Sequence, residues 1–385
     1  MTMRIRTRII QIGTVQIGGG LPVVLQSMTA TKTTDVIKTA ETCQRLADAG
    51  AGIVRVAVDT LRDAEALREI RRIIQRDTNV NLSVDLQENY RLAETVAPFV
   101  DKIRYNPGHL HHVEPETSWQ TKVERIVQIA RQHDCALRIG VNCGSLDPAL
   151  GQTADGRRQT TDIDAAINSA LQHAEFIDSL GFDRFCVSIK SSDPKAVLFA
   201  NRQFAAQRPD VPLHLGLTEA GLPPMGIEKS RAALEPLLAE GIGDTLRVSL
   251  TVPNDRKAEE IEAGRLILQN VASGIVLTDW QPEKLNIISC PSCARVENEQ
   301  FVALAERVRD AMRIRESATL SPLTIAVMGC RVNGPGETDH ADIGLWCGKT
   351  LVNLKSGSTL IGSFGYDEVI EKMLTEVDKL LGKRT

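Results

Sequence analysis

Gly52-Ile53-Val54-Arg55-Val56-Ala57-Val58 is the stretch that decides the fold, together with the amphipathic segment that follows it. A short run of β-branched residues predicts a β-strand, and apolar residues that recur every three or four positions predict a helix. This pair of patterns repeats along most of the chain. The predicted strands are Val23–Thr29, Gly52–Val58, Asn81–Leu86, Lys102–Asn106, Ala136–Asn142, Arg184–Lys190, Leu213–Thr218 and Thr245–Leu250.

Eight strand–helix units in series predict an α/β fold of the parallel (βα)8, or TIM-type, barrel kind. A doubly wound parallel sheet is the alternative, but it usually has fewer strands and a glycine-rich turn after the first of them. Gly18-Gly19-Gly20 comes before the first strand, so we expect it to form the turn of an N-terminal hairpin. Asp193-Pro194 predicts a helix start, with an acidic N-cap and proline in the first turn. We assign residues 1–275 to the barrel.

The repeat stops around Ser273–Glu283, and a smaller α+β domain is predicted over residues 284–385. Its helices are expected from apolar stripes with helical spacing. The predicted elements are a strand at Asn286–Ser289, a helix around Phe301–Met312, a strand at Thr324–Met328, a hairpin over Leu351–Ile361 with Gly357 at its turn, and a last helix from Val369 to Leu381.

The composition is that of an ordinary globular protein, with 42% hydrophobic residues, 24% charged residues and a formal net charge of −4. This balance gives no general attraction to nucleic acid or to an anionic membrane. The sequence has no run of about 18 apolar residues that predicts a membrane span, and no apolar N-terminal run that predicts a signal peptide. The eight cysteines of such a chain favour reduced thiols and metal binding over disulfides. We therefore expect a cytoplasmic protein that binds neither nucleic acid nor membrane.

Five cations stand at equivalent positions, the ends of different predicted strands: Arg55, Arg104, Arg138, Lys190 and Arg247. A single arginine in a barrel is more often part of a structural ion pair. Five like charges at one barrel mouth need a bound anion to compensate them, and arginine matches the geometry of phosphate oxygens. The strand ends therefore predict a substrate with a phosphate group, and two phosphates suit this charge. The other polar residues at these ends are Asp85, Gln87, Asn106, Asn142, Glu219 and Ser249.

A second constellation lies near the C-terminus, where Cys290-Pro291-Ser292-Cys293 is followed by Cys330. Three thiolates are a poor fit to a closed zinc site, which has four Cys or His ligands. They suit a cubane iron–sulfur cluster with one iron left for a different ligand. Glu337 is either a solvated loop acid or, beyond the Gly334-Pro335-Gly336 turn, an oxygen ligand that folds back onto the open iron. Cys347 is an alternative fourth thiolate, although it lies in a strand-like run.

These residues resemble one family closely. The chain is similar over nearly its whole length to the 4-hydroxy-3-methylbut-2-enyl diphosphate synthases of the non-mevalonate (methylerythritol phosphate) isoprenoid pathway, in their bacterial two-domain form. The resemblance implies an oxidoreductase with a TIM-type barrel and an iron–sulfur domain. It rests on the stretches Val24–Thr29, Gly140–Leu146, Leu217–Gly221, Ser289–Arg295 and Val327–Glu337.

The resemblance implies a [4Fe–4S] cluster on Cys290, Cys293 and Cys330, with Glu337 as a labile fourth ligand. It implies two-electron reductive ring opening of 2-C-methyl-D-erythritol 2,4-cyclodiphosphate, with loss of water, to (E)-4-hydroxy-3-methylbut-2-enyl diphosphate. Glu219 is then the candidate proton donor or transition-state stabiliser. The electrons must come from outside the chain, because it has no flavin or nicotinamide motif, and the resemblance implies a flavodoxin or a ferredoxin as the donor. The family also implies a homodimer in which the cluster domain of one chain caps the barrel of the other.

Two positions depart from the family pattern. Gln87 stands where the family usually has histidine, and His109 stands where it usually has asparagine after Asn106-Pro107-Gly108. Glutamine donates a hydrogen bond to phosphate but carries no proton near neutral pH. One hypothesis is that His109 supplies the function that position 87 lost. The other is that residue 87 only contacts phosphate.

Two rival functions stay open at this point. The first rival is a diverged paralogue that reduces another phosphorylated metabolite. The second is a non-enzymatic redox sensor whose barrel binds an anion. Gln87 is the sequence feature that favours the paralogue. The sensor leaves Glu219 and an open iron without a role.

Overall fold

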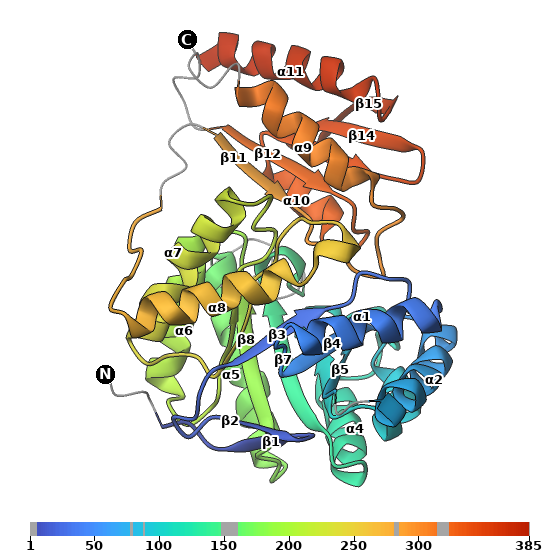
Figure 1. Ribbon diagram of the computed structural model, residues 1–385, viewed down its shortest axis with the longest axis vertical. Coiled ribbons are helices and arrows are strands. Elements are labelled where there is room, and N and C mark those ends of the chain that lie inside the picture. The colour runs from blue at the N-terminus through green and yellow to red at the C-terminus, as the bar shows by residue number, and fades with distance from the viewer. Residues whose placement is uncertain are drawn as a thin grey trace.

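A parallel barrel forms the larger part of the computed structural model, which describes residues 6–77, 80–87, 89–147, 161–280, 285–313 and 323–384. Its strands neighbour one another in chain order from β3 to β8, and β3 also pairs with β10, which pairs with β9. A single bridge between Val187 and Leu213 joins β8 to β9 and completes the ring. Helices surround the strands (Figure 1). The predicted (βα)8 barrel is confirmed.

Apart from Val24 and Leu25 at the start of β3, the barrel strands are buried along their whole length, which explains why they appear in the sequence as continuous apolar runs. In β4, for example, every residue from Ile53 to Ala57 is buried. The strands are β3 (Val24–Met28), β4 (Ile53–Ala57), β5 (Leu82–Leu86), β6 (Lys102–Tyr105), β7 (Ala136–Asn142), β8 (Phe185–Lys190), β9 (His214–Gly216) and β10 (Thr245–Arg247).

Four of the surrounding helices, α1, α4, α5 and α6, begin at a side-chain N-cap. The Asp193 side chain accepts a hydrogen bond from the Lys195 backbone N–H at 3.0 Å, and Pro194 follows it, so the predicted helix start is confirmed. No helix in the described part of the chain is long and apolar enough to cross a bilayer. The barrel helices are α1 (Val36–Asp48), α2 (Leu61–Asp77), α3 (Ala93–Val96), α4 (Trp119–Gln132), α5 (Asp162–Ser179), α6 (Pro194–Gln207), α7 (Met225–Ala239) and α8 (Glu259–Ala272).

A hairpin of β1 (Ile10–Ile12) and β2 (Val15–Ile17) closes the end of the barrel opposite the C-terminal domain (Figure 1). Its isoleucines pack in one apolar cluster with residues of three barrel strands. The expected position of its turn is wrong. The turn lies at Gly13, whose φ of +54° suits glycine, and it is fixed by a 2.7 Å hydrogen bond from the Thr14 N–H to Asn81. The Gly18–Gly20 run instead follows the hairpin and leads into β3.

The C-terminal domain is built on a five-stranded sheet with the strands in chain order. The first two pairings are parallel and the last two are antiparallel. Apolar faces of α9 (Gln300–Arg313) and α11 (Val369–Arg384) supply much of its core. The predicted strands, helices and hairpin are present, with Gly357 in the turn at a φ of +54°. The strands are β11 (Leu285–Ser289), β12 (Leu323–Met328), β13 (Ile343–Cys347), β14 (Leu351–Ser356) and β15 (Thr359–Gly365).

The segment after Cys330 forms a short helix, α10 (Gly334–His340), where the sequence predicts a turn. That prediction is wrong because proline is compatible with the first turn of a helix, where its missing N–H has no intrahelical partner. Gly334 is also required by packing, since a Cβ there would lie 2.8 Å from the Trp346 indole nitrogen. As a result Glu337 is held on a helix and not on a loop.

The C-terminal domain covers the mouth of the barrel of its own chain (Figure 1). Lys229 of α7 contacts a residue on each side of the boundary between the two domains. Its ammonium lies 5.2 Å from the centroid of the Trp280 ring, before that boundary, and 3.3 Å from the Asn286 side-chain oxygen, after it. Both sides of the site come from the one chain of this structure. The cap from a partner chain that the resemblance implies stays a prediction.

Candidate active site

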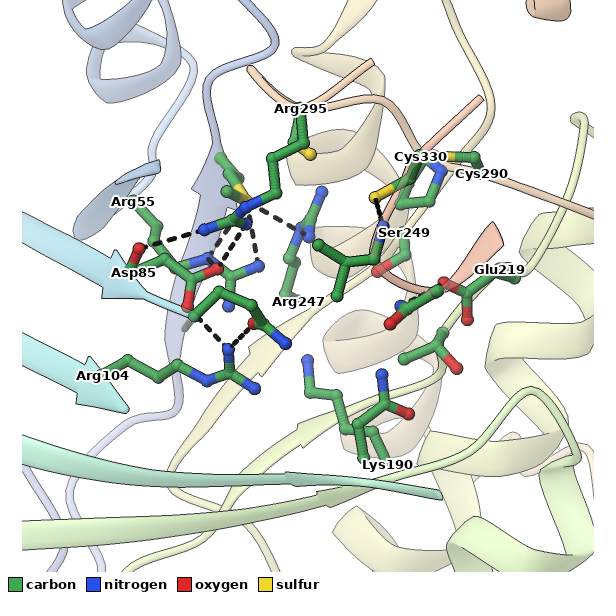
Figure 2. Close-up of a pocket in the computed structure, with 18 of the residues that line it drawn as sticks. Arg55, Asp85, Arg104, Lys190, Glu219, Arg247, Ser249, Cys290, Arg295 and Cys330 are labelled. Carbon is green, nitrogen blue, oxygen red and sulfur yellow. Dashed lines mark hydrogen bonds and ion pairs between the residues drawn. The ribbon is translucent and has the colours of Figure 1, made fainter. Parts of the chain in front are cut away.

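A cavity of about 100 Å³ lies between the barrel mouth and the C-terminal domain, and Figure 2 shows side chains from both around it. The structure brings together ten of the site residues expected on the barrel with the three expected cysteines. The barrel contributes Met28, Arg55, Asp85, Gln87, Arg104, Arg138, Val141, Asn142, Ser188, Lys190, Thr218, Glu219, Arg247 and Ser249. The C-terminal domain contributes Cys290, Pro291, Ser292, Cys293, Arg295, Cys330, Val332 and Asn333.

Arg138 is the least compensated cation of this cavity. Its side chain comes from the middle of β7 and is only 1% exposed. Two of its guanidinium nitrogens, Nε and Nη1, have no hydrogen-bond partner among the described residues. Burial and the nearby Arg104 charge lower its pKa to about 10, so Arg138 still carries its charge near neutral pH. A buried and unpaired cation that faces a cavity is a site for an anion.

The other cations of the mouth contact neighbouring side chains. Lys190 lies 3.2 Å from His214 Nε2, and His214 Nδ1 lies 2.7 Å from the Thr245 hydroxyl. Burial, followed by the charge of Lys190, holds the pKa of His214 well below its usual value, so this ring is neutral. A neutral imidazole can accept from the ammonium and thereby orient it.

Glu260 of α8 balances part of the positive charge, and the sequence analysis missed it. Its carboxylate accepts from Arg247 at 3.2 Å, from Lys257 at 2.6 Å and from the Ser27 hydroxyl at 2.8 Å. The sequence of α8 does not predict that this acid is fully buried, because Ser27 and Arg247 come from other parts of the chain.

Asp85, on the opposite side of the mouth, binds cations from both domains. Arg104 donates to its Oδ1 at 2.7 Å, and Arg295 from the C-terminal domain donates to its Oδ2 at 3.1 Å. Gln87 accepts from Arg104 and lines the cavity, as expected of a residue near the phosphates. The nearby cations hold the pKa of Asp85 well below its usual value against the effect of burial.

The three cysteine thiols meet at the cap side of the cavity. Contact with the Cys290 thiol, and burial, raise the pKa of Cys330 to about 12, and contact with Cys330 raises the pKa of Cys293. Among the described residues no three Cys, His, Asp or Glu side chains are arranged to hold a single metal ion. Three adjoining thiols with no fourth ligand beside them fit a polynuclear cluster better than one zinc ion. Cys347 is buried on β13 and does not line the cavity.

Glu219 faces the cysteines across the cavity (Figure 2). Its backbone has a φ of +46°, which is unusual for a residue other than glycine and indicates a position fixed by its surroundings. Asn333 donates to its Oε1 at 3.0 Å, whereas Oε2 has no hydrogen-bond partner in the described chain. Burial raises the pKa of Glu219.

Two expected site residues lie outside the lining of this cavity. The Asn106 amide is used locally, since it accepts from the Gly108 N–H at 3.1 Å and donates to Ser145 at 3.0 Å. Glu337 accepts a 3.2 Å hydrogen bond from Ser192 and faces a second cavity. Burial and the Glu219 charge raise the pKa of Glu337 to about 8. Its assignment as a cluster ligand stays a prediction.

The sequence analysis also missed Arg295 and Asn333, which enter the site from the cap. Both closely follow one of the three cysteines, at two positions after Cys293 and three after Cys330. That proximity was the available signal. It was not sufficient, because a loop position does not indicate which way a side chain points.

The fold and the site define a two-domain barrel enzyme whose cation-lined mouth is covered by a cysteine-bearing domain. Family models match both parts. The GcpE TIM-barrel domain matches residues 7–265, and the GcpE protein C-terminal domain matches residues 286–379. The chain therefore belongs to the GcpE family, the family of the 4-hydroxy-3-methylbut-2-en-1-yl diphosphate synthases, as the sequence predicts.

Curated relatives match the chain from end to end. A 4-hydroxy-3-methylbut-2-en-1-yl diphosphate synthase (flavodoxin) from Rhodopirellula baltica is 54% identical over 387 residues, which cover 99% of each chain. A protein of the same name from Persephonella marina is 38% identical over 99% of each chain. Among solved structures, a Yersinia pestis dihydropteroate synthase matches 69% of this chain and 100% of its own, at 12% identity and a TM-score of 0.48.

Proposed function

We propose that this chain converts 2-C-methyl-D-erythritol 2,4-cyclodiphosphate to (E)-4-hydroxy-3-methylbut-2-enyl diphosphate. In that reaction the bond from C2 to its phosphate oxygen and the bond from C3 to its hydroxyl oxygen break, and a C2=C3 double bond forms. One water leaves. Two electrons enter, with two protons when the phosphates are counted as neutral acids, and an external reductant supplies the electrons.

The observation that carries this proposal is the uncompensated charge of the barrel mouth. Arg138 is buried with two unpaired guanidinium nitrogens, and Arg55, Lys190 and Arg247 line the same cavity. A cyclic diphosphate brings two negative phosphates, which suit several arginines and a lysine around a small volume. Asn142 and Ser249 add neutral donors at the same strand ends.

Cys290, Cys293 and Cys330 are the residues that would hold the [4Fe–4S] cluster of the family. When bound, such a cluster supplies single electrons and a Lewis-acidic iron. The donor set fits because three thiols adjoin one another at the cavity and no fourth cysteine lines it. Glu337 is the proposed fourth ligand, and reaching that role needs its side chain to leave the Ser192 hydroxyl.

Glu219 is the side chain that we assign to proton transfer. Its Oε2 is unpaired among the described residues and borders the cavity, and burial raises its pKa. A carboxyl group with a raised pKa retains a proton closer to neutral pH and can deliver it to a departing oxygen. Asn333 orients the carboxyl group through the other oxygen.

The relatives are named for flavodoxin, and we propose a flavodoxin or ferredoxin as the electron donor of this chain as well. A homodimer and a cytoplasmic location stay part of the proposal. Donor identity is testable by comparing turnover supported by each reduced protein at equal potential.

The experiment that tests the function is anaerobic turnover of the cyclodiphosphate by the reconstituted protein with an artificial one-electron reductant, with the product identified by mass. We expect the hydroxymethylbutenyl diphosphate as product. The matched control is Glu219→Gln, which keeps the Asn333 contact and is expected to lower turnover by about 10²-fold while substrate binding stays within a few-fold. Failure of the wild-type protein with a fully loaded cluster would overturn the assignment and favour a different phosphorylated substrate.

A further inference from the structure

Arg295 is a residue of the cysteine loop whose side chain lies in the barrel. Its guanidinium makes a bidentate pair with Asp59, at distances from 2.7 to 3.0 Å, and a 3.1 Å pair with Asp85 Oδ2. It also donates to the Asp85 backbone carbonyl at 3.1 Å. Figure 2 shows it between the cap and Arg55. Because each of its nitrogens already has a partner, Arg295 has little capacity to hold a substrate phosphate itself.

Arg55 and Arg295 compete for the same oxygen. Arg55 Nε lies 4.0 Å from Asp85 Oδ2, at the limit of an ion pair, whereas Arg295 lies 3.1 Å from that oxygen. The Arg55 guanidinium donates hydrogen bonds to the Met28 sulfur, at 3.0 and 3.1 Å. A thioether is a weak acceptor, so Arg55 keeps most of its capacity for a phosphate oxygen.

The competition connects two events at the site. When the loop of Arg295 is docked, Asp85 has a cation from the cap, and Arg55 faces the cavity. When that loop is displaced, Arg55 becomes the cation nearest to Asp85 Oδ2, because Arg104 is bonded to Oδ1 at 2.7 Å. An anion that binds Arg55 then competes with Asp85 for it.

We propose that Arg295 couples docking of the cysteine loop to binding of the substrate phosphate, by taking Asp85 away from Arg55. This inference rests on the proposed function and makes Arg295 a positioning residue. The coupling is reciprocal, since whatever docking contributes to anion affinity, the anion contributes to docking. A bound diphosphate therefore holds the cluster-bearing loop over the site.

The test uses the full chain with its cluster loaded, and inorganic pyrophosphate as the probe in anaerobic calorimetry. We expect Arg295→Gln to weaken pyrophosphate binding about tenfold, which is about 1.4 kcal/mol. The cluster absorption spectrum is expected to stay the same, since the guanidinium contacts Asp59 and Asp85 and not the thiols. The matched control is Arg331→Gln. Arg331 belongs to the same domain and pairs with the same Asp59 at 3.1 Å, and not with Asp85. We expect it to change binding less than about twofold.

A double-mutant cycle separates coupling from simple adhesion of the domains. If Arg295 acts through Arg55, then Arg55→Gln weakens pyrophosphate binding strongly in the wild-type background and clearly less in the Arg295→Gln background. Additive effects, or equal effects of the Arg295 and Arg331 variants, overturn the inference. Should Arg295→Gln fail to fold, Arg295→Lys replaces it, because a lysine can satisfy only one of the two acids. Binding equal to wild type in that variant also overturns it.

The two proposals fail in different ways. A wild-type protein that binds pyrophosphate with the expected coupling but does not turn over the cyclodiphosphate contradicts the proposed function alone. A protein that turns over the cyclodiphosphate and shows additive variants contradicts the role of Arg295 alone.

Discussion

The barrel mouth differs in the pairing of its cations from the interface between the barrel and the C-terminal domain, which we call the seam. In the mouth, the buried Arg138 has two nitrogens without partners, and Arg55 contacts only a sulfur and a distant carboxylate. In the seam, Arg295 has every nitrogen bonded, and Lys257 bonds both Glu260 and the Pro291 carbonyl. The paired cations of the seam therefore hold the two domains together, whereas the mouth has cations that are available to bind an anion.

The two regions also differ in how the backbone holds their side chains. Mouth residues stand on parallel strands whose ladders fix them on both sides, for example Arg104 opposite Arg138. Cap residues stand in loops, and Ser292 in the cysteine loop has a φ of +62°. We expect the mouth to bind anions whether or not the cap carries its cofactor, and the cap to supply the redox chemistry alone.

The largest effect that sharpens this comparison is expected from Cys330→Ala. Loss of one of three thiolates removes the cluster, so turnover should fall by at least about 10³-fold, because the cofactor carries the electron chemistry. Pyrophosphate affinity should stay within about threefold, because Cys330 contributes no charge to the mouth. Iron analysis and calorimetry measure the two effects, and a parallel loss of anion binding would mean that docking of the Arg295 loop depends on the cluster.

Arg138→Met should give the converse result, with two effects of opposite sign. Removal of a buried cation without partners is expected to raise the free energy of unfolding by about 1–3 kcal/mol. Pyrophosphate affinity should fall by about 100-fold, while iron content is unchanged. Denaturant unfolding and calorimetry provide the two readouts.

Arg125→Met is the control for this variant. Arg125 is a half-exposed arginine of α4 that pairs with Glu94 at 2.9 Å, and its replacement should change the free energy of unfolding by less than about 0.5 kcal/mol. A loss of stability in Arg138→Met would show that Arg138 is compensated within the protein.

The same contrast explains how much of the molecule was predictable. The sequence identifies the eight strands and the five cations because strand periodicity is local, and the C-terminal ends of parallel strands necessarily meet. Arg295, Asn333 and Glu260 escape such reasoning. Their contacts with Asp85, Glu219 and Ser27 span 210, 114 and 233 residues of chain, and no local pattern records them.

Local propensity also misled at two places. Gly334-Pro335-Gly336 predicts a turn, yet the packing of Gly334 against Trp346 makes it the start of α10. Asn106 stands at a strand end like the binding residues, but its amide is occupied by Gly108 and Ser145. In both cases tertiary contacts decide between structures that the sequence alone leaves equivalent.

Lys102 is a further buried cation of the barrel. It is fully buried on β6 and donates to the Gln26 side chain at 2.9 Å. Burial lowers its pKa to about 7. Between pH 7 and the ordinary lysine pKa, the unfolded chain binds the additional proton, so the free energy of unfolding contributed by Lys102 rises with pH over this window.

Lys102→Met should therefore stabilise the protein at pH 7 and lose this advantage by about pH 10. The expected gain at pH 7 is about 2 kcal/mol, because relief of the buried charge is partly offset by the unpaired Gln26 oxygen. Guanidinium unfolding of both proteins at the two pH values measures the difference. A gain that is the same at both would contradict the titration of Lys102.

The smallest effect is expected from His109→Asn, the residue that the sequence suggested as a replacement for the family histidine at position 87. His109 is buried in the 3-10 turn Pro107–His112 and does not line the cavity, whereas Gln87 does. Burial, followed by the charges of His112 and Arg104, lowers the pKa of His109 to about 3, so its ring is neutral throughout the physiological range and has no proton to exchange. Turnover should change by less than about twofold, with the same pH profile between pH 6 and 8. Gln87→His should instead add a titrating group beside Arg104 and alter that profile, because residue 87 lines the cavity that we propose for the substrate. A sharp loss of turnover in His109→Asn with an unchanged Gln87→His profile would reverse this assignment and extend the catalytic side of the mouth beyond the cavity.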